Sequence, residues 1–305
     1  MQALYAHNRN ADLTLEGGRK NLAKTLDNFI DQYHYILFTF TKVVHFLTTD
    51  AEIKAGKLLP TEKDGEVNLK LLDNNFFKAL ESNSTFDQMT SKGKFDSLLD
   101  ANVIATLYRK MANDPRYVDY LDTKLSGEKE DFQIVKYIIE DLMFHDEVFQ
   151  QHMEDLFPRW QDDNEFLYSQ MGKRLKAWKK DAENVAAIVY QKDASFREIE
   201  DFADQLFLKT ADRDPELHAI IGKYLKNWDE KRLALIDTIL MKMAACELLY
   251  FKEIPVKVTI NEYIDISKSY STPKSKEFIN GILDKLMKDL SNEGRIVKEG
   301  RGLKN

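Results

Sequence analysis

The placement of proline constrains the fold of this sequence more strongly than any other feature. A proline inside a helix removes a backbone hydrogen bond and clashes with the preceding turn, whereas one at the first helical position is tolerated. Each of the six prolines falls between helical patterns or at the first turn of one. They are Pro60, Pro115, Pro158, Pro215, Pro255 and Pro273. The long stretches between them can therefore form uninterrupted helices.

The composition agrees with a helical globular protein. Charged residues make up 31% and apolar residues 43% of the 305 positions, with only 12 glycines, which favours helices over turn-rich β architectures. The length allows two domains, each with its own core. The single cysteine, Cys246, has no internal disulfide partner, which fits a reducing compartment. Because no membrane span or secretory signal is recognisable, we expect a cytoplasmic protein with no membrane partner.

Helical spacing of apolar residues is clearest in the C-terminal third. Asp214 with Pro215, and Thr272 with Pro273, predict the first turns of two helices. Between these, a helix starting at Asp229 carries a broad apolar face and is predicted to be central.

Residues 254–270, IPVKVTINEYIDISKSY, combine a short strand-like alternation with helical spacing. Thr259 and Glu262 fit a capping box, so we expect a helix from about Thr259. A start at Val256, or a short strand over residues 256–258, remains as an alternative.

The first two thirds of the sequence is also predicted to be helical. The longest pattern runs from about Glu16 to Thr48, and residues 48–68 form the clearest loop. The best domain boundary lies near residues 190–195. Further helices are expected near residues 68–82, 94–112, 115–125, 129–156, 164–190 and 195–210.

The sequence lacks the common catalytic motifs. No zinc-protease, phosphate-binding-loop, dinucleotide-binding or serine-hydrolase pattern is present. His145 and His152 stand seven residues apart on one expected helix, with Asp141 one turn before His145, but such a set is more often packed or solvent-facing than metal-binding. We therefore expect no enzyme, no catalytic residues, no metal and no cofactor.

Three motifs of the C-terminal third resemble the NusB family of bacterial transcription antitermination factors. They occur in the family's order and spacing at residues 244–248 (AACEL), 254–262 (IPVKVTINE) and 278–284 (FINGILD). In addition, QALY at residues 2–5 is similar to the end of the family's first helix motif. The resemblance implies an all-α fold, with a NusB-like helical bundle at the C-terminus and an additional N-terminal helical region.

The implied domains are a helical N-terminal region over residues 1–190, a NusB-like domain over residues 191–292 and a basic tail over residues 293–305. Residues 1–8 of the first region resemble the first helix motif. Five residues of these motifs are interpreted as fold determinants: Ile254, Pro255, Asn261, Glu262 and Gly281. Gly281 is expected to allow another helix to approach closely.

The function implied by the resemblance is RNA binding in transcription antitermination. Family members pair with the ribosomal protein NusE, bind boxA-type single-stranded RNA of ribosomal RNA operons, and contact the RNA polymerase complex indirectly. On this analogy Gln2, Lys274 and Phe278 are RNA-binding positions, and Tyr5 and Asp237 are partner-binding positions. Phe278 is expected either to stack on a base or to be buried. Asp237 is treated as an exposed helix charge, so that Asp237→Lys would weaken association without unfolding the protein.

Two features depart from the family pattern. An arginine-rich segment normally precedes the first helix and contacts RNA, whereas this sequence begins at Met1 of MQALY, so either the start is truncated or that contact is lost. The second departure is the stretch of about 180 residues between QALY and the matching C-terminal part, which is more than a minimal family member needs. Apart from these departures, the net charge of −7 argues against a general positive field for nucleic acid. The main alternative is therefore a non-enzymatic helical protein-interaction scaffold that has lost RNA binding.

Overall fold

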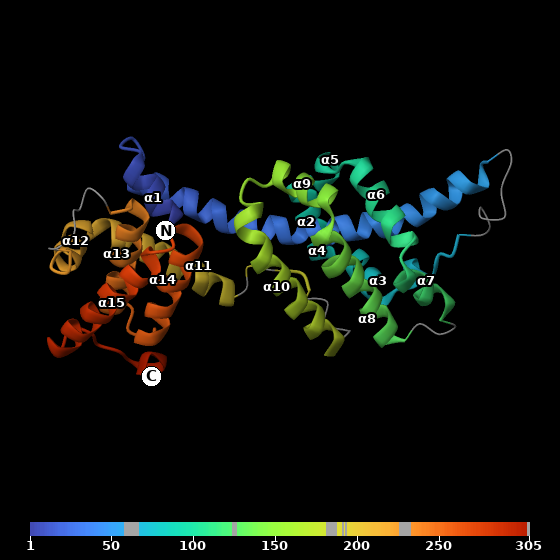
Figure 1. The fold of residues 1–305 in the computed structure, drawn as a ribbon. Coiled ribbons are helices and arrows are strands. Elements are labelled where there is room, and N and C mark those ends of the chain that lie inside the picture. The colour runs from blue at the N-terminus through green and yellow to red at the C-terminus, as the bar shows by residue number, and fades with distance from the viewer. Residues whose placement is uncertain are drawn as a thin grey trace. The chain divides into compact units, whose positions relative to one another are not determined.

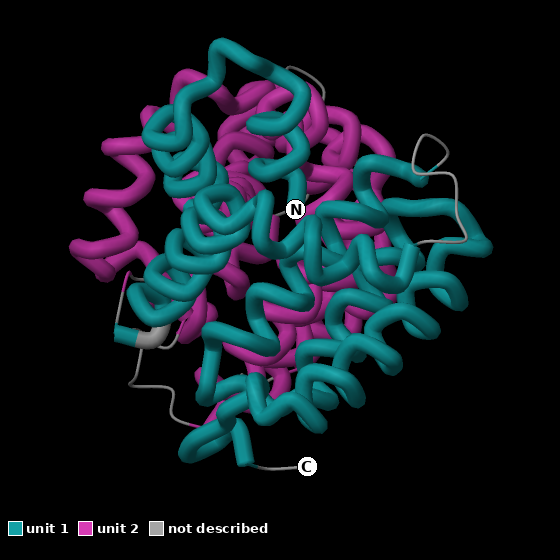
Figure 2. Tube along the Cα trace, turned by 90° about the vertical axis from the view of Figure 1, so that its left-hand side faces the viewer, with its two compact units in different colours: residues 1–26, 193–305 teal, residues 27–192 magenta. Residues whose placement is uncertain are grey.

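The computed structural model describes residues 1–57, 67–123, 127–180, 188–190, 192, 194–225 and 233–303. Every regular element within these residues is helical, which confirms the all-α fold class (Figure 1). The chain divides into two compact units, coloured separately in Figure 2. Unit 1 comprises Met1–Leu26 and Asp193–Asn305, and unit 2 comprises Asp27–Lys192. None of the described helices combines the length and apolar character that a membrane crossing requires.

Unit 1 is a bundle built around α13 (Leu235–Tyr250), against which α1, α11, α12, α14 and α15 all pack (Figure 1). Residues 239–241 and 243–246 of α13 are buried apolar side chains, so nearly its whole circumference is apolar. A helix that is apolar all round belongs in a core. The prediction of a central helix is therefore confirmed, although its expected start, Asp229, lies outside the described residues. The remaining helices of unit 1 are α1 (Gln2–Arg9), the first part of α2 (Leu15–Ala55), α11 (Ala194–Asp212), α12 (Asp214–Gly222), α14 (Val256–Tyr270), α15 (Ser275–Asn292) and a 3-10 turn (Gly300–Leu303).

Unit 2 is organised around the remainder of α2. Between residues 32 and 41 this helix buries Tyr33, Tyr35 and Phe40 together with polar side chains, so it too is surrounded by other elements. The other elements are a 3-10 turn (Lys70–Asp73), α3 (Asn75–Glu81), α4 (Ser84–Gly93), α5 (Phe95–Leu98), α6 (Ala101–Ala112), α7 (Pro115–Asp122), α8 (Glu128–Lys136), a π-helix (Tyr137–Leu142), a 3-10 turn (Met143–His145), α9 (Glu147–Leu156) and α10 (Trp160–Lys180).

Two local predictions in unit 2 were wrong. The expected loop over residues 48–68 begins too early, because α2 continues to Ala55, and residues 58–66 of this loop lie outside the described residues. Asp50 stabilises this last part of α2 by pairing with Lys54 at 2.8 Å and accepting a hydrogen bond from Tyr108 at 2.6 Å. The sequence reasoning also missed α4, which begins where Asn83 accepts a hydrogen bond from the Phe86 amide.

The single helix expected over residues 129–156 is broken. After α8 the chain forms the π-helix and a 3-10 turn, and Asp146 then starts α9 by accepting a hydrogen bond from the Phe149 amide at 2.9 Å. As a result, His145 and His152 lie on different elements and do not share one helix face. Asp146, in the sequence HDEV, is a recognisable N-cap signal for the start of α9.

Helical geometry prevails over the strand alternative at residues 254–270. The helix α14 begins at Val256, which confirms the alternative start in place of Thr259, and the predicted capping box does not form. Thr259 is fully buried and its hydroxyl lies 3.5 Å from the Pro255 carbonyl, while Glu262 is exposed in the second turn. The helix starts early because Val256 and Ile260 pack against the core of unit 1.

Two further helix starts differ by a few residues from the prediction. Asp214 is the first residue of α12 and not its cap, and its carboxylate pairs with Lys242 of α13 at 2.5 Å. Similarly, α15 begins at Ser275, with Lys274 rather than Thr272 at the cap position.

Candidate interaction face

A buried carboxylate joins the start of α13 to the start of α15. Asp237 lies in the first turn of α13 and is only 5% exposed. Its carboxylate accepts a hydrogen bond from the Ser275 hydroxyl at 2.7 Å and another from the Ser271 hydroxyl. Ser275 also lies 2.9 Å from the Thr272 hydroxyl, so the connection between α14 and α15 forms a small polar network around Asp237.

The interpretation of Asp237 as an exposed helix charge was therefore wrong. Sequence alone could not reveal this, because the two serines that cover Asp237 lie more than thirty residues further along the chain. A lysine at this position would place an ammonium group in a pocket of hydroxyl groups and remove the acceptor. Charge reversal here is expected to destabilise unit 1 as well as to alter its surface.

Lys274 and Phe278 lie beside this network. Lys274 directly precedes Ser275 and is exposed, and its carbonyl accepts a hydrogen bond from the Phe278 amide at 3.3 Å. Phe278, one turn further along α15, is partly buried and packs against the core of unit 1. The expected burial of Phe278 thus applies in part, since its side chain contacts the core and keeps some accessible surface, and stacking on a base stays a prediction.

Gln2 and Tyr5 are carried by α1, which packs against α13 and α11. The helix is held by Leu4, which is buried in the core of unit 1. Tyr5 is 38% exposed, and Gln2 is partly exposed. All five predicted site residues therefore belong to unit 1, and four of them retain accessible surface.

Three motif positions interpreted as fold determinants are exposed. Asn261 and Glu262 lie on the outer side of α14 rather than at its start. A Cβ atom added to Gly281 would meet no atom within 4 Å, so Gly281 does not allow another helix of this unit to approach closely. The expected capping by Asn261 and Glu262 and the expected close helix approach at Gly281 are therefore wrong, while a contact of Asn261 and Glu262 with a neighbouring chain stays a prediction.

The opposite end of α13 carries a second buried carboxylate. Glu247 is 4% exposed and accepts a hydrogen bond from Tyr263 of α14 at 2.9 Å. Burial raises the pKa of Glu247, although the hydrogen bonds from Thr259 and Tyr263 favour its ionised form. At the same end of α13, the Lys298 ammonium group donates a hydrogen bond to the Phe251 carbonyl at 2.9 Å.

The residues that follow α15 return to the end of α13. The Glu299 amide donates to the Lys252 carbonyl at 2.9 Å, and the Glu299 carboxylate pairs with the Lys252 side chain at 2.7 Å. Gly302 is buried, and a Cβ atom at this position would lie 2.0 Å from the Lys252 carbonyl oxygen. Residues 298–303 are therefore docked on unit 1.

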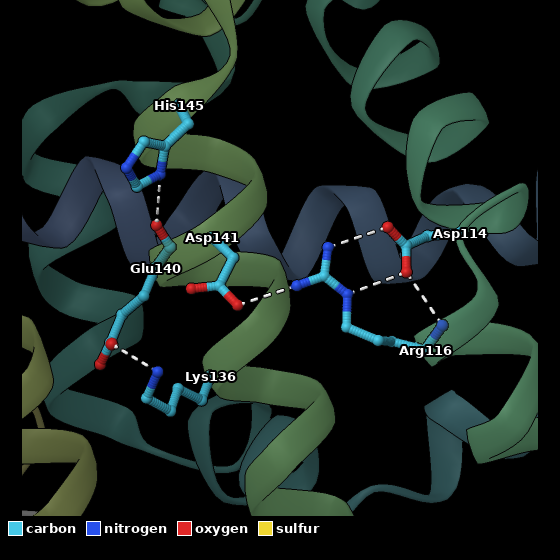
Figure 3. Close-up of polar contacts among 6 residues, drawn as sticks. All are labelled: Asp114, Arg116, Lys136, Glu140, Asp141 and His145. Carbon is cyan, nitrogen blue, oxygen red and sulfur yellow. Dashed lines mark hydrogen bonds and ion pairs between the residues drawn. The ribbon is translucent and has the colours of Figure 1, made fainter.

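Unit 2 contains a polar cluster that the sequence reasoning missed (Figure 3). Arg116 at the start of α7 pairs with Asp114 at 2.9 Å and with Asp141 of the π-helix at 3.0 Å. The hydrogen bonds from Arg116 lower the pKa of Asp114 to about 2. The guanidinium group also lies 3.8 Å from the centre of the Tyr137 ring.

The second half of this cluster centres on Glu140, which is 5% exposed. One carboxylate oxygen pairs with Lys136 at 3.0 Å, while the backbone carbonyl of Glu140 lies 3.0 Å from Nδ1 of His145 (Figure 3). A Cβ atom on Gly172 would lie 3.0 Å from the other carboxylate oxygen, so the glycine allows α10 to approach Glu140. The ion pairs of the cluster connect the π-helix with α7 through Arg116 and with α8 through Lys136, while the second Glu140 carboxylate oxygen is buried without a hydrogen-bond partner among the described residues.

The histidines considered as metal ligands have other contacts. His145 interacts with the Glu140 carbonyl, and Nε2 of His152 lies 2.7 Å from the Tyr35 hydroxyl. Over the described ranges no group of three or more histidine, cysteine, aspartate or glutamate side chains is arranged to hold a metal ion.

Comparison with known proteins shows a family resemblance in part of this chain. Residues 165–288 match the sequence model of the NusB family. The matched range begins within α10 and ends within α15, so it includes Asp237, Lys274 and Phe278. The chain thus contains a NusB family region at its C-terminus, and it carries additional helices on the N-terminal side of this region.

Three bacterial proteins are similar in sequence to part of this chain. The protein named Transcription antitermination protein NusB from Salinibacter ruber is 48% identical over 103 residues, which cover 34% of this chain and 64% of that protein. Proteins of the same name from Chloroherpeton thalassium and Thermodesulfovibrio yellowstonii are 40% and 41% identical, over 40% and 30% of this chain and 54% and 61% of theirs. The chain thus spans between 54% and 64% of the length of these relatives. A solved structure of T. maritima NusB is 28% identical, with a TM-score of 0.30 over 40% of this chain and 84% of that one.

Proposed function

We propose that this protein is an RNA-binding transcription antitermination factor. The observation that supports this most directly is the NusB family match over residues 165–288, together with the names of the relatives. We further propose that it acts with NusE on boxA RNA of ribosomal RNA operons, and reaches the RNA polymerase complex through that assembly.

The proposed RNA contacts are Gln2, Lys274 and Phe278. Lys274 is exposed at the start of α15, where its ammonium group can pair with a phosphate. The accessible part of the Phe278 ring, one turn away, can stack on an unpaired base. This pair provides one electrostatic and one stacking contact, which is the usual combination for single-stranded RNA.

The proposed contacts with NusE are Tyr5 and Asp237. Tyr5 presents an exposed aromatic ring on α1. Asp237 is buried beneath Ser271 and Ser275, so its proposed contribution is to position the connection between α14 and α15 for the partner.

Binding of boxA RNA to the purified chain, with and without NusE, tests this function. Fluorescence anisotropy with boxA RNA and a scrambled RNA should show tighter binding of boxA by the pair, and affinity should fall as salt rises. Equal affinity for the two RNAs, or no binding in the presence of NusE, would contradict RNA-dependent antitermination.

Variants on α15 separate the two proposed contacts. Lys274→Glu should weaken RNA binding and reduce the slope of log affinity against log salt concentration by about one. Lys285→Glu, at an exposed lysine of α15, is the matched control and should leave RNA binding unchanged. Phe278→Leu retains an apolar side chain for the core but removes the ring, and should cost about 1–3 kcal/mol of RNA binding. Unchanged binding by both Lys274→Glu and Phe278→Leu would remove these residues from the RNA site.

The alternative function is a protein-interaction scaffold without RNA binding. The net charge of −7 is the observation that favours it. Association with NusE in the absence of any boxA preference would support this alternative.

A further inference from the structure

A groove of about 1150 Å³ lies in unit 1, away from the proposed RNA and NusE contacts. It is lined by α11, by the C-terminal part of α13 and by the first half of α14. Both α11 and α14 pack against α13, so the groove has two helical walls with a third helix beneath them.

Large apolar side chains are exposed along both walls. Phe202 of α11 is 37% exposed and Val258 of α14 is 44% exposed. Ile199, one turn before Phe202, is 48% exposed but is not one of the residues that line the groove. Between the walls, Tyr263 is buried, and the rings of Phe202 and Phe251 meet edge to face at 5.3 Å. Contiguous exposed apolar surface of this kind is uncommon unless another molecule covers it.

The walls of the groove carry acidic side chains. Glu198 and Asp201 on α11 and Glu262 on α14 are exposed and line the groove. Among the described residues no lysine, arginine or histidine nitrogen forms an ion pair with any of these three carboxylates. Their negative charge is therefore available to a ligand.

The cations that line the groove are already engaged by the protein itself. Each contacts an aromatic ring or a carboxylate of unit 1 other than Glu198, Asp201 and Glu262. The contacts are Lys209 over the Phe251 ring at 4.8 Å, Lys252 with Glu299 at 2.7 Å and Arg301 with Glu253 at 3.6 Å.

We propose that this groove binds a basic amphipathic helix of a protein partner. A helix placed between two helical walls can present apolar residues at i, i+3 or i+4 and i+7 to the floor, as in other helix-in-groove complexes. Lysine or arginine residues beside that apolar stripe would then meet the unpaired carboxylates. The same carboxylates repel the phosphates of RNA, which makes RNA a poor occupant.

The groove and the proposed RNA face can be occupied together. Asp237 is in the first turn of α13, and Phe251 directly follows the last turn. At 1.5 Å per residue, these two ends of α13 are roughly 20 Å apart. The groove therefore offers a second contact surface, and its existence does not depend on whether the chain binds boxA RNA.

A model peptide tests the proposal with the full chain. The probe is a fluorescein-labelled helix of about four turns, with leucine on one face and lysine on the flanks. Anisotropy should show binding with a Kd on the order of 10 µM that weakens as salt is raised. A scrambled peptide of the same composition is the control, because it keeps the charge but not the apolar face.

Paired variants test the two features separately. Phe202→Ser, and Asp201→Lys combined with Glu262→Lys, should each weaken peptide binding by about tenfold or more. Val297→Ser, at an apolar residue outside the groove that is 48% exposed, and Asp212→Lys, at the end of α11, should leave it unchanged. Circular dichroism checks that every variant retains its helical content.

Three results would overturn the proposal. The first is equal binding of the scrambled peptide, or unchanged binding by the groove variants. The second is displacement of the peptide by oligouridine, which would indicate a nucleic-acid site. The third is self-association of the chain that Phe202→Ser abolishes in sedimentation velocity, which would identify a second copy as the occupant.

Discussion

Replacing Asp237 by alanine should destabilise unit 1 although this carboxylate lies at the start of a helix. The structure buries the side chain to 5% exposure and gives it hydrogen bonds from Ser271 and Ser275. A hydrogen bond to a charged group contributes about 1.5–3 kcal/mol, which sets an upper bound of about 3–6 kcal/mol for two.

The expected loss is smaller than this bound because the serines retain other partners. Ser271 and Ser275 lie 2.9 Å apart, and Ser275 also contacts Thr272, so neither hydroxyl is left without a hydrogen bond. Removing a negative charge from the first turn of α13 costs a further 0.3–1 kcal/mol or so. We therefore expect Asp237→Ala to lower the free energy of unfolding of unit 1 by about 3 kcal/mol.

Hydrogen exchange of α13 and α15 amides, followed by mass spectrometry, measures this effect in unit 1 alone. Asp284→Ala is the control, since Asp284 forms only a surface pair with Lys288 on α15, and it should cost less than about 0.5 kcal/mol. A double-mutant cycle with Ser275→Ala should give a favourable coupling of about 1 kcal/mol.

A stabilising role of the buried Asp237 carboxylate would be excluded if Asp237→Ala were no more destabilising than Asp284→Ala, or if it showed no coupling with Ser275→Ala. The result also decides how a NusE contact can be tested. Because Asp237→Lys changes the fold and the surface together, Asp237→Asn, which preserves shape, is the better variant for measuring association.

Three further predictions concern stability and the docked C-terminal segment. Burial lowers the pKa of His34 to about 4, below its ordinary 6.5, so the native state binds fewer protons than the unfolded chain; stability of unit 2 should fall by about 2 kcal/mol between roughly pH 7.5 and pH 5. His34→Leu should flatten this dependence, measured by urea unfolding with the fluorescence of buried Trp160 and Trp178 in a Trp228→Phe background, and an identical slope would exclude His34 as the cause. Gly281→Ala should stabilise α15 by about 0.5–1 kcal/mol, because the added methyl group meets open space, and a loss of stability by hydrogen exchange would show an unrecognised packing role. Gly302→Ala should release the C-terminal segment and accelerate tryptic cleavage after Lys298 and Arg301, because the new Cβ would collide with the Lys252 carbonyl; Gly222→Ala, with open space around it, is the control, and equal cleavage rates would contradict docking.

The fold class was predictable because its signals are local. Proline positions and apolar spacing act over one or two helical turns, and they correctly predicted an all-helical chain with α13 at the centre of unit 1. The errors lie where distant contacts extend or interrupt a helix. Tyr108 contacts Asp50 near the end of α2, and Val256 packs on the core of unit 1, so both helices are longer than the sequence pattern indicates.

The candidate site was only partly predictable from sequence. The motifs led to Lys274 and Phe278, which do lie together at the start of α15. The state of Asp237 and Gly281 was not predictable, because nothing adjacent in the sequence indicates that one is covered by two serines and the other faces open space.

Local patterns in the sequence are sufficient to predict that this chain forms helices, and the same sequence carries the motifs that resemble the NusB family. Which side of each helix remains accessible follows from the packing of the helices in three dimensions. It buried Asp237, exposed Glu262 and opened a groove between α11 and α14. The physical reason is that helix formation depends on residues within a few turns, whereas the exposure of a side chain depends on elements that are far apart along the chain.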